Sequence, residues 1–211
     1  MMPRASHLIA EDKESEFNAL IQKSYDFTLA IALPMTVGLI CCAPNLITSL
    51  CGVKFENSIL PSQIIAPIIL MVAISNVFGI QVLFPKGKIN IVTLCCGIGA
   101  VVDLVLNLCL IPFFSYVGTS IAYLGAEVAT TISMFFIGRK YLPITYFKKN
   151  HLNYLLGCIL MAIVLYAIAD LQFSTISILI LQGCSGIVVY FLVLCVRKDI
   201  FLMQVLSKIK K

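Results

Sequence analysis

The sequence predicts an all-α, polytopic membrane protein with six transmembrane helices. Of its 211 residues, 60% are hydrophobic and 12% are charged, and the mean hydropathy is +1.02. Soluble domains average about 45–50% apolar and about 25% charged residues. The apolar residues here gather in stretches close to the ~20 residues that cross the hydrocarbon core of a bilayer. We therefore expect the chain to lie in a lipid bilayer.

The expected spans follow one another with short connectors rich in Gly, Pro, Asn, Ser or charge, as helical hairpins require. They are Phe27–Cys51, Ile59–Phe84, Asn90–Pro112, Val117–Ile137, Leu152–Ala169 and Phe173–Val196. The connectors "LIPFFSYVG" and "DLQF" are typical of tight turns.

The segment before the first span is polar and does not have the apolar region of a signal peptide. Phe17, Leu20, Ile21 and Ser24 recur at helical spacing. This pattern predicts an amphipathic helix on the inner membrane surface. For residues 1–12, a solvated leader is an equal alternative.

Basic residues predict the orientation of the chain. Of the fifteen Lys and Arg residues, all but Lys54 lie in the N-terminal segment, the even-numbered connectors or the tail. Under the positive-inside rule, both termini are cytoplasmic. The net charge of +5 is then a consequence of topology. No basic stretch is interleaved with stacking aromatic residues, which argues against nucleic-acid binding.

Nothing in the sequence predicts a cofactor, a metal site or catalytic residues. The nine cysteines form no CxxC motif and are interpreted as small buried apolar residues. His7 and His151 have no partner at ligand spacing, and "FPKGKIN" is too short for a phosphate-binding loop. We therefore expect a protein that is not an enzyme and not an ATPase.

Two carboxylates lie inside expected spans. Asp103 precedes Pro112 by nine residues and Glu127 follows Val117 by ten. At ~1.5 Å per residue, both lie near the bilayer midplane. A carboxylate facing lipid there costs about 2.5–3.5 kcal/mol, so each should face protein or water. Asn107, four residues after Asp103, is an expected hydrogen-bond partner. Either the pair is a proton- or cation-responsive site in a translocation cavity, or protonated carboxyls cross-link helices.

Small residues and helix breakers complete the candidate set. The fourth span carries a ridge at a spacing of four that lets another helix approach closely: Gly118, Ala122, Ala126 and Thr130. Prolines are expected to break or bend the first two spans: Pro34, Pro44 and Pro67. The second span also carries Ser75, Asn76, Gly79 and Gln81. Their polar groups either satisfy freed carbonyls or line a polar cavity.

Three stretches carry a resemblance to a family. In order they are "LPMTVGLICCAPNLITSLCG", "IIAPIILMVAISNVFGIQVLFPKGK" and "NLCLIPFFSYVGTSIAYLGAEVA". The chain resembles polysaccharide biosynthesis proteins, the O-antigen and capsule repeat-unit flippases of the multidrug/oligosaccharidyl-lipid/polysaccharide exporter superfamily. The resemblance runs from Pro3 to about Arg139. It implicates these positions: Pro34, Pro44, Ser75, Asn76, Gly79, Gln81, Pro85, Gly87, Asn107, Pro112, Gly118 and Glu127. Asp103 departs from the family pattern, in which Asn is usual.

The resemblance implies a two-lobed, MATE-like transporter of about twelve to fourteen helices. Its implied task is to move undecaprenyl-pyrophosphate-linked oligosaccharides across a bacterial plasma membrane. This chain would be the C-terminal half, truncated or split from an N-terminal lobe. Since no Lys or Arg falls within the spans, that lobe would supply the cations for the pyrophosphate.

The resemblance divides the chain into a cytoplasmic leader, four helices of the transporter lobe, a basic loop, two peripheral helices and a basic tail. The boundaries are 1–26, 27–137, 138–151, 152–196 and 197–211. Three alternatives stay open. They are a drug/cation antiporter that uses Asp103 and Glu127, a membrane enzyme of glycan assembly, and a purely structural membrane protein.

Overall fold

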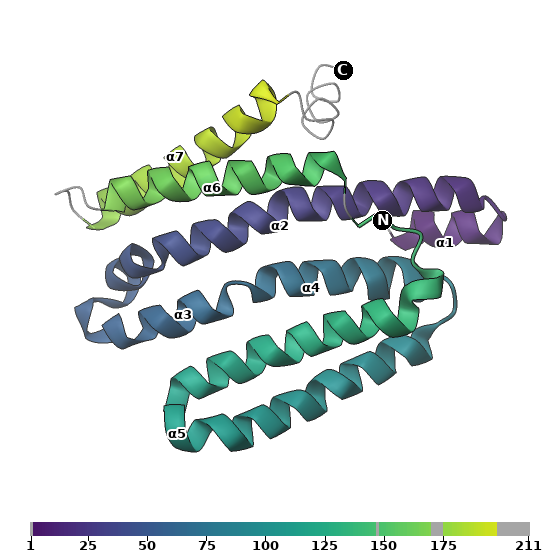
Figure 1. Ribbon diagram of the computed structural model, residues 1–211, viewed down its shortest axis with the longest axis horizontal. Coiled ribbons are helices and arrows are strands. Elements are labelled where there is room, and N and C mark those ends of the chain that lie inside the picture. The colour runs from purple at the N-terminus through teal and green to yellow at the C-terminus, as the bar shows by residue number, and fades with distance from the viewer. Residues whose placement is uncertain (1, 147, 170–174, 198–211) are drawn as a thin grey trace. The chain divides into compact units, whose positions relative to one another are not determined.

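A computed structural model describes residues 2–146, 148–169 and 175–197. In this part of the chain every regular element is a helix, which confirms the all-α prediction. In order, the elements of Figure 1 are α1 (Met2–Ala10), α2 (Glu14–Cys51), the 3-10 helix η1 (Val53–Ser58), α3 (Ile59–Ile65), α4 (Ile68–Asn76), the π-helix η2 (Val77–Leu83), α5 (Ile89–Gly138), the 3-10 helix η3 (Arg139–Tyr141), α6 (Lys149–Ala169) and α7 (Thr175–Val196).

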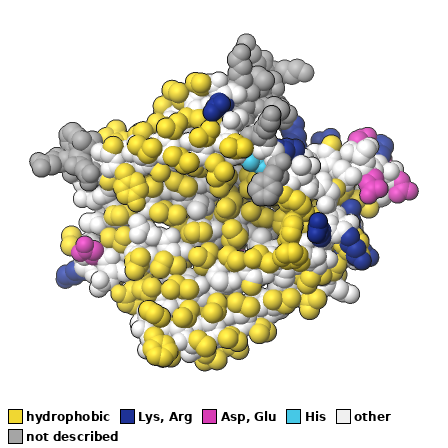
Figure 2. Space-filling model, in the orientation of Figure 1, with side chains coloured by type: hydrophobic (Ala, Val, Ile, Leu, Met, Phe, Trp, Pro, Cys, Tyr) yellow, Lys and Arg dark blue, Asp and Glu magenta, His cyan; other side chains and the backbone are white. Residues whose placement is uncertain are grey.

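Five helical segments in the described residues are long and apolar enough to cross a membrane. They are Glu14–Cys51, Val53–Leu83, Ile89–Tyr141, Asn150–Ala169 and Thr175–Val196. The third contains 53 residues, about twice the length that one crossing needs. Large apolar side chains also stay exposed, such as Phe113 (81%) and Leu108 (70%). Hydrophobic side chains cover most of the face seen in Figure 2, as expected of a surface that contacts lipid.

The extra length of α5 is explained by a fold in its middle. Ser115 has φ 50° and ψ −127°, outside the helical region, and it joins two helical arms. Figure 1 shows the arms side by side as a hairpin. The first arm (89–114) contains the third expected span and the second arm (116–138) the fourth. Five segments therefore give six crossings, and the turn predicted in "LIPFFSYVG" is confirmed at Ser115. The turn predicted in "DLQF" lies outside the described residues.

The chain forms two compact units. Unit 1 contains residues 1–29 and 68–146, and unit 2 contains residues 30–67 and 147–211. Helix α2 contributes its first half to unit 1 and its second half to unit 2. The division of the transporter lobe and the two peripheral helices proposed from the sequence stays a prediction.

The core of unit 1 is built from α2, α4, η2 and α5. Phe17 and Ile21 of α2 are fully buried, as are Val82 and Leu83 of η2. The Oγ atom of Ser24 donates a hydrogen bond to Oε1 of Gln81 (2.5 Å), which ties α2 to the π-helix. These α2 residues belong to the same helix as the first span. A location on the inner membrane surface stays a prediction.

Two buried side chains on α7 make three hydrogen bonds within unit 2. The hydroxyl of Tyr190 donates to the carbonyl oxygen of Ala30 in α2 (2.6 Å). The amide of Gln182, which has no exposed surface, accepts a bond from Asn45 (3.1 Å) and donates one to the carbonyl of Leu165 (3.1 Å). Helices α2, α6 and α7 are thus joined by polar contacts inside an apolar unit.

The prolines behave differently from one another. Pro67 separates α3 from α4, as predicted. Pro34 and Pro44 lie inside α2, which continues through both, so the expected breaks do not occur there. A transmembrane helix tolerates proline when the carbonyl four residues earlier, which loses its N–H donor, finds another one. The Ala30 carbonyl, freed by Pro34, accepts from the Tyr190 hydroxyl (2.6 Å), and the Ile40 carbonyl, freed by Pro44, accepts from Nε2 of Gln63 (3.0 Å).

Candidate functional site

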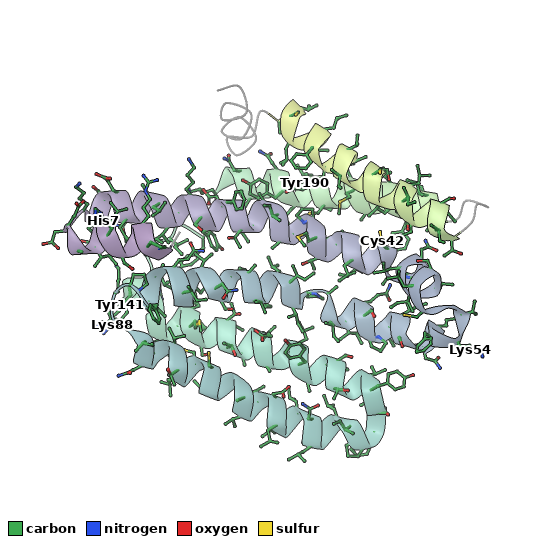
Figure 3. All side chains as sticks on the ribbon, turned by 180° about the vertical axis from the view of Figure 1, so that it is seen from behind. His7, Cys42, Lys54, Lys88, Tyr141 and Tyr190 are labelled. Atoms are coloured by element: carbon green, nitrogen blue, oxygen red, sulfur yellow. The ribbon has the colours of Figure 1, made fainter. Side chains whose placement is uncertain are left out.

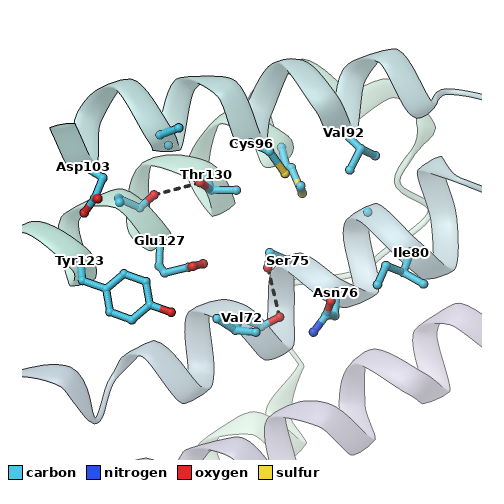
Figure 4. A pocket seen from close by; sticks show the side chains of 15 residues that line it. Val72, Ser75, Asn76, Ile80, Val92, Cys96, Asp103, Tyr123, Glu127 and Thr130 are labelled. Atoms are coloured by element: carbon cyan, nitrogen blue, oxygen red, sulfur yellow. Dashed lines mark hydrogen bonds between the residues drawn. The ribbon is translucent and has the colours of Figure 1, made fainter. Parts of the chain in front are cut away.

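A cavity of about 480 Å³ lies in unit 1 between α4, η2 and the two arms of α5. Figure 4 shows side chains from all of these elements facing the same space. The lining residues are Val72, Ser75, Asn76, Gly79, Ile80, Val92, Cys96, Gly99, Ala100, Asp103, Tyr123, Ala126, Glu127, Thr130 and Met134. Its volume is in the range of ligand pockets, about 300–1,000 Å³.

The cavity brings together the two intramembrane carboxylates. Asp103 on the first arm and Glu127 on the second arm both line it, because the turn at Ser115 makes the arms antiparallel and the two residues lie at matching distances from it. Each is half-buried. Among the described residues, neither carboxylate has a hydrogen bond or an ion pair. Two carboxyl groups therefore face the cavity without a cationic partner in the described part of the chain.

Neutral polar groups surround the carboxylates. The Ser75 hydroxyl donates to the Val72 carbonyl (3.0 Å), and the Thr130 hydroxyl donates to the Ala126 carbonyl (2.9 Å). Since these protons are used in helix backbone contacts, each hydroxyl oxygen presents only lone pairs to other groups. In Figure 4 the Glu127 side chain extends into the cavity, with Tyr123 and Ser75 near it. Such a set of oxygen atoms can accept a proton or a hard cation.

Close packing of the arms forms one wall of the cavity. A Cβ atom on Gly99 would overlap Oγ1 of Thr130 and would lie 3.2 Å from the Ala126 carbonyl oxygen. Thr131, beside this contact, donates from its hydroxyl to the carbonyl of Met71 in α4 (3.2 Å). Ala126 and Thr130, two members of the predicted small-residue ridge, therefore face the first arm closely.

Several predicted residues lie elsewhere. Asn107 does not bind the Asp103 carboxylate as expected, because its Nδ2 donates to the Asp103 main-chain carbonyl (2.9 Å). Gln81 is bonded to Ser24 and does not line the cavity. Gly118 and Ala122 are buried closer to the hairpin turn.

Sequence reasoning missed Tyr123 and Cys96 as lining residues. Tyr123 precedes Glu127 by four positions, so both lie on the same face of the second arm. That spacing was the available signal. Cys96 precedes Asp103 by seven positions, which is again one face of a helix.

Comparison with known proteins assigns a family. A family model described as lipid II flippase MurJ matches residues 1–183. The chain belongs to the lipid II flippase MurJ family. This family is described as one of lipid II flippases, which supports the expected resemblance to flippases of lipid-linked precursors, whereas the O-antigen and capsule branch is not confirmed. A flippase family is also consistent with the expectation that the protein is not an enzyme. No curated protein matches the chain.

A solved structure supports the MurJ fold of this chain. The chain is similar to "Lipid II flippase MurJ, inward closed conformation", with a TM-score of 0.79 and 17% sequence identity. The match covers 97% of this chain and 43% of that chain. At this identity the likeness shows the fold alone. The chain therefore spans less than half the length of the flippase that it resembles.

No cationic side chain lines the cavity between α4, η2 and the arms of α5. None of its lining residues is Lys or Arg. In the described residues there is also no group of three or more His, Cys, Asp or Glu side chains that could hold a metal ion. The cavity is acidic and polar, and it is unsuited by itself to an anionic headgroup.

Proposed function

We propose that the chain forms the C-terminal part of a flippase that moves a lipid-linked glycan precursor across a bacterial plasma membrane by alternating access. The observation that carries this proposal is the match of the MurJ family model to residues 1–183. Lipid II is the first candidate substrate because it is the substrate named for that family. The lipid bilayer is the second partner, since the helices are long and apolar enough to span it.

A second lobe is part of the proposal. The chain corresponds to 43% of the similar flippase structure. A headgroup that carries phosphate needs cationic hydrogen-bond donors, and neither the cavity nor the expected spans contain Lys or Arg. We infer that an N-terminal lobe contributes these cations, while this chain contributes the acidic cavity.

Asp103 and Glu127 are proposed as a proton- or cation-responsive pair. Two carboxylates in one cavity repel each other when both are ionised, and a bound cation or proton relieves that repulsion. Neutralisation therefore favours closer packing of α4 and the arms of α5. A ligand shifts a conformational equilibrium only if it binds the two conformations with different affinities. A cation or proton that binds the closely packed conformation more tightly would therefore couple its binding to the change of conformation. Ser75 and Asn76 would supply neutral polar groups at the same site.

A surface-polysaccharide repeat unit is the second candidate substrate. It is favoured by the three sequence stretches that resemble repeat-unit flippases. An antiporter of small organic cations would also use an acidic cavity, but the family match favours a lipid-linked substrate.

Complementation tests the proposal. Bacteria depleted of their own lipid II flippase would produce this chain alone, or together with a separately produced N-terminal lobe of a MurJ-family flippase. We expect lipid II to become accessible to an impermeant enzyme outside the cell only when both parts are present. If lipid II stays inside while lipid-linked repeat units are exported, the second candidate replaces the first. Export of neither would refute the proposed function.

A further inference from the structure

A second cavity lies at one end of unit 1. Its volume is about 340 Å³, and it is separate from the acidic cavity because the two share no lining residue. The lining residues are Leu8, Ile9, Asp12, Glu14, Phe17, Lys86, Lys88 and Tyr141. Two cations, two anions and four apolar or aromatic side chains therefore surround one space.

This cavity lies where helices end. Lys86 and Lys88 lie between the end of η2 at Leu83 and the start of α5 at Ile89. Tyr141 is the last residue of η3, at the far end of the second arm of α5. Figure 3 shows Lys88 and Tyr141 close together at this end of unit 1. Because these are ends of segments long and apolar enough to cross a bilayer, we expect the cavity to lie at the boundary between water and hydrocarbon.

Two lysines form one wall, and aromatic rings position both. The Nζ atom of Lys86 donates to the main-chain carbonyl of Tyr141 (3.2 Å) and lies 5.2 Å from the centre of the Phe17 ring. The Nζ atom of Lys88 lies 5.2 Å from the centre of the Tyr141 ring. Cation–π contacts hold an ammonium in place without cancelling its charge. Lys86 retains two further N–H donors, and Lys88 has three.

Two carboxylates form a second part of the wall, at the turn between α1 and α2 and at the start of α2. Asp12 has a left-handed backbone (φ 55°), and Glu14 begins α2. The neighbouring Lys13 is paired with Glu11 at 2.9 Å. In the described part of the chain, Asp12 and Glu14 make no ion pair, and neither do Lys86 and Lys88. Opposite charges line the cavity on separate segments without neutralising one another.

We propose that this cavity binds the headgroup of a phospholipid whose headgroup carries both a phosphate and a primary ammonium, as in phosphatidylethanolamine. Lys86 and Lys88 hold the phosphate, and Asp12 and Glu14 accept hydrogen bonds from the ammonium. Leu8, Ile9 and Phe17, which are buried or half-buried, cover the glycerol and the start of the acyl chains.

The charge pattern selects among headgroups. The four charged side chains sum to zero, so a purely anionic headgroup meets repulsion from the carboxylates as well as attraction from the lysines. A choline headgroup has no N–H to donate to the carboxylates. Its usual partners are open aromatic faces, and the lysines already lie over Phe17 and Tyr141. A phosphoethanolamine headgroup offers its phosphate to the lysines and its ammonium to the carboxylates. This inference does not depend on the transported substrate.

Lipid retention tests the proposal. The purified full chain in detergent is offered equal amounts of dioleoyl-phosphatidylethanolamine, -phosphatidylglycerol and -phosphatidylcholine, and bound lipid is counted by native mass spectrometry. One charge-assisted hydrogen bond changes affinity by about tenfold, so we expect phosphatidylethanolamine to be retained at least about tenfold better than the other two. Preference for phosphatidylglycerol, or displacement by inorganic phosphate alone, would overturn the proposal.

Paired variants identify the cavity. Lys86→Gln with Lys88→Gln should lower phosphatidylethanolamine retention by about tenfold or more. Lys140→Gln is the matched control, because Lys140 also contacts the Tyr141 ring but does not line the cavity. Equal retention by the double variant and the control would contradict the assignment.

The carboxylate variants test whether Asp12 and Glu14 determine the headgroup preference or whether the lysines alone attract any phospholipid. Asp12→Asn with Glu14→Gln removes the negative wall, and Asn tolerates the left-handed backbone at position 12. The cavity then carries two net positive charges, so the preference should change from phosphatidylethanolamine to phosphatidylglycerol. Glu16→Gln, which does not line the cavity, should leave the preference unchanged. An unchanged preference in the double variant refutes the role of the carboxylates. Helix content by circular dichroism checks folding, and the wild-type preference is informative by itself.

Discussion

Asp103 and Glu127 of the α5 hairpin show which properties of a single residue the sequence predicts and which it does not. Their depth and their common cavity follow from counting residues on two antiparallel helices, and the structure places both in one cavity. The partner of Asp103 could not be predicted in the same way. Asn107 is at the expected spacing, but its amide binds the main-chain carbonyl. Spacing selects a helix face, whereas the side-chain rotamer decides which oxygen atom is reached.

Neutralising Glu127 should reduce transport. In the two-part complementation system, Glu127→Gln removes the charge and keeps the shape of the side chain. If the carboxylate contributes about 1.5–3 kcal/mol to cation or proton binding, the export rate falls by about tenfold or more. Glu56→Gln, in η1 and outside the acidic cavity, is the control. Export by Glu127→Gln at the wild-type rate, with equal protein in the membrane, would exclude Glu127 from the mechanism.

A single hydroxyl on α7 should stabilise unit 2. Tyr190→Phe removes the bond to the Ala30 carbonyl and leaves that buried acceptor unpaired. We expect a loss of about 0.5–1.5 kcal/mol in the free energy of unfolding. This loss is measured by thermal unfolding that is monitored through the reaction of a thiol dye with Cys158, which is buried in the same unit.

Tyr166→Phe is the matched control for Tyr190→Phe, because Tyr166 is 61% exposed and its hydroxyl makes no hydrogen bond to the described part of the chain. Equal unfolding temperatures for the two variants would show that the Tyr190 bond contributes nothing to stability.

At the scale of elements, the α5 hairpin depends on close approach near its turn. A Cβ atom on Gly118 would lie 2.7 Å from the Leu110 carbonyl oxygen and 2.8 Å from its carbon. Both are main-chain atoms, which cannot rotate away. Gly118→Ala should therefore separate the arms and destabilise unit 1 by about 1–3 kcal/mol. Dye labelling of Cys95, which is fully buried in unit 1, reports the change.

Gly97→Ala provides the opposite expectation in the same helix. A Cβ atom there meets no atom within 4 Å, and Ala is favoured over Gly inside a helix by about 0.5–1 kcal/mol. This variant should unfold at the wild-type temperature or slightly above it. If both variants shift stability equally, the contact at Gly118 is not what limits the hairpin.

Element positions were largely predictable because the hydrophobic length needed to cross a bilayer is a strong constraint. The described helices contain the first and the third to fifth expected spans, the second as far as Leu83 and the sixth from Thr175, and the turn at Ser115 is in the predicted connector. Residues 173–174 of the sixth expected span lie outside the described residues. The effect of individual prolines was not predictable. Proline removes the same backbone donor at Pro34, Pro44 and Pro67, yet only Pro67 separates two helices. The π-helix at Val77–Leu83 was also not predicted, because hydrophobic spacing does not distinguish a π-helical turn from an α-helical one.

At the scale of the whole molecule, the proposed function requires a second lobe. The family is evident from residues 1–183, and the acidic cavity is complete within unit 1. A cavity with two carboxylates and no Lys or Arg does not bind a phosphate-bearing headgroup unaided. The sequence could therefore predict the class of protein and the acidic cavity. The cations that the proposed function requires are absent from the expected spans.

At the scale of the whole molecule, the positions of the basic residues also predict on which side of the membrane each connector lies. An epitope inserted after Lys54, in the connector with a single basic residue, should be accessible to antibody on intact spheroplasts. An epitope inserted after Gly87, between Lys86 and Lys88, should become accessible only after permeabilisation, because basic connectors stay on the cytoplasmic side. Labelling of the Gly87 epitope on intact spheroplasts would show that the orientation is opposite to the predicted one. It would also move the proposed phospholipid site to the outer leaflet, since Lys86 and Lys88 form its cationic wall.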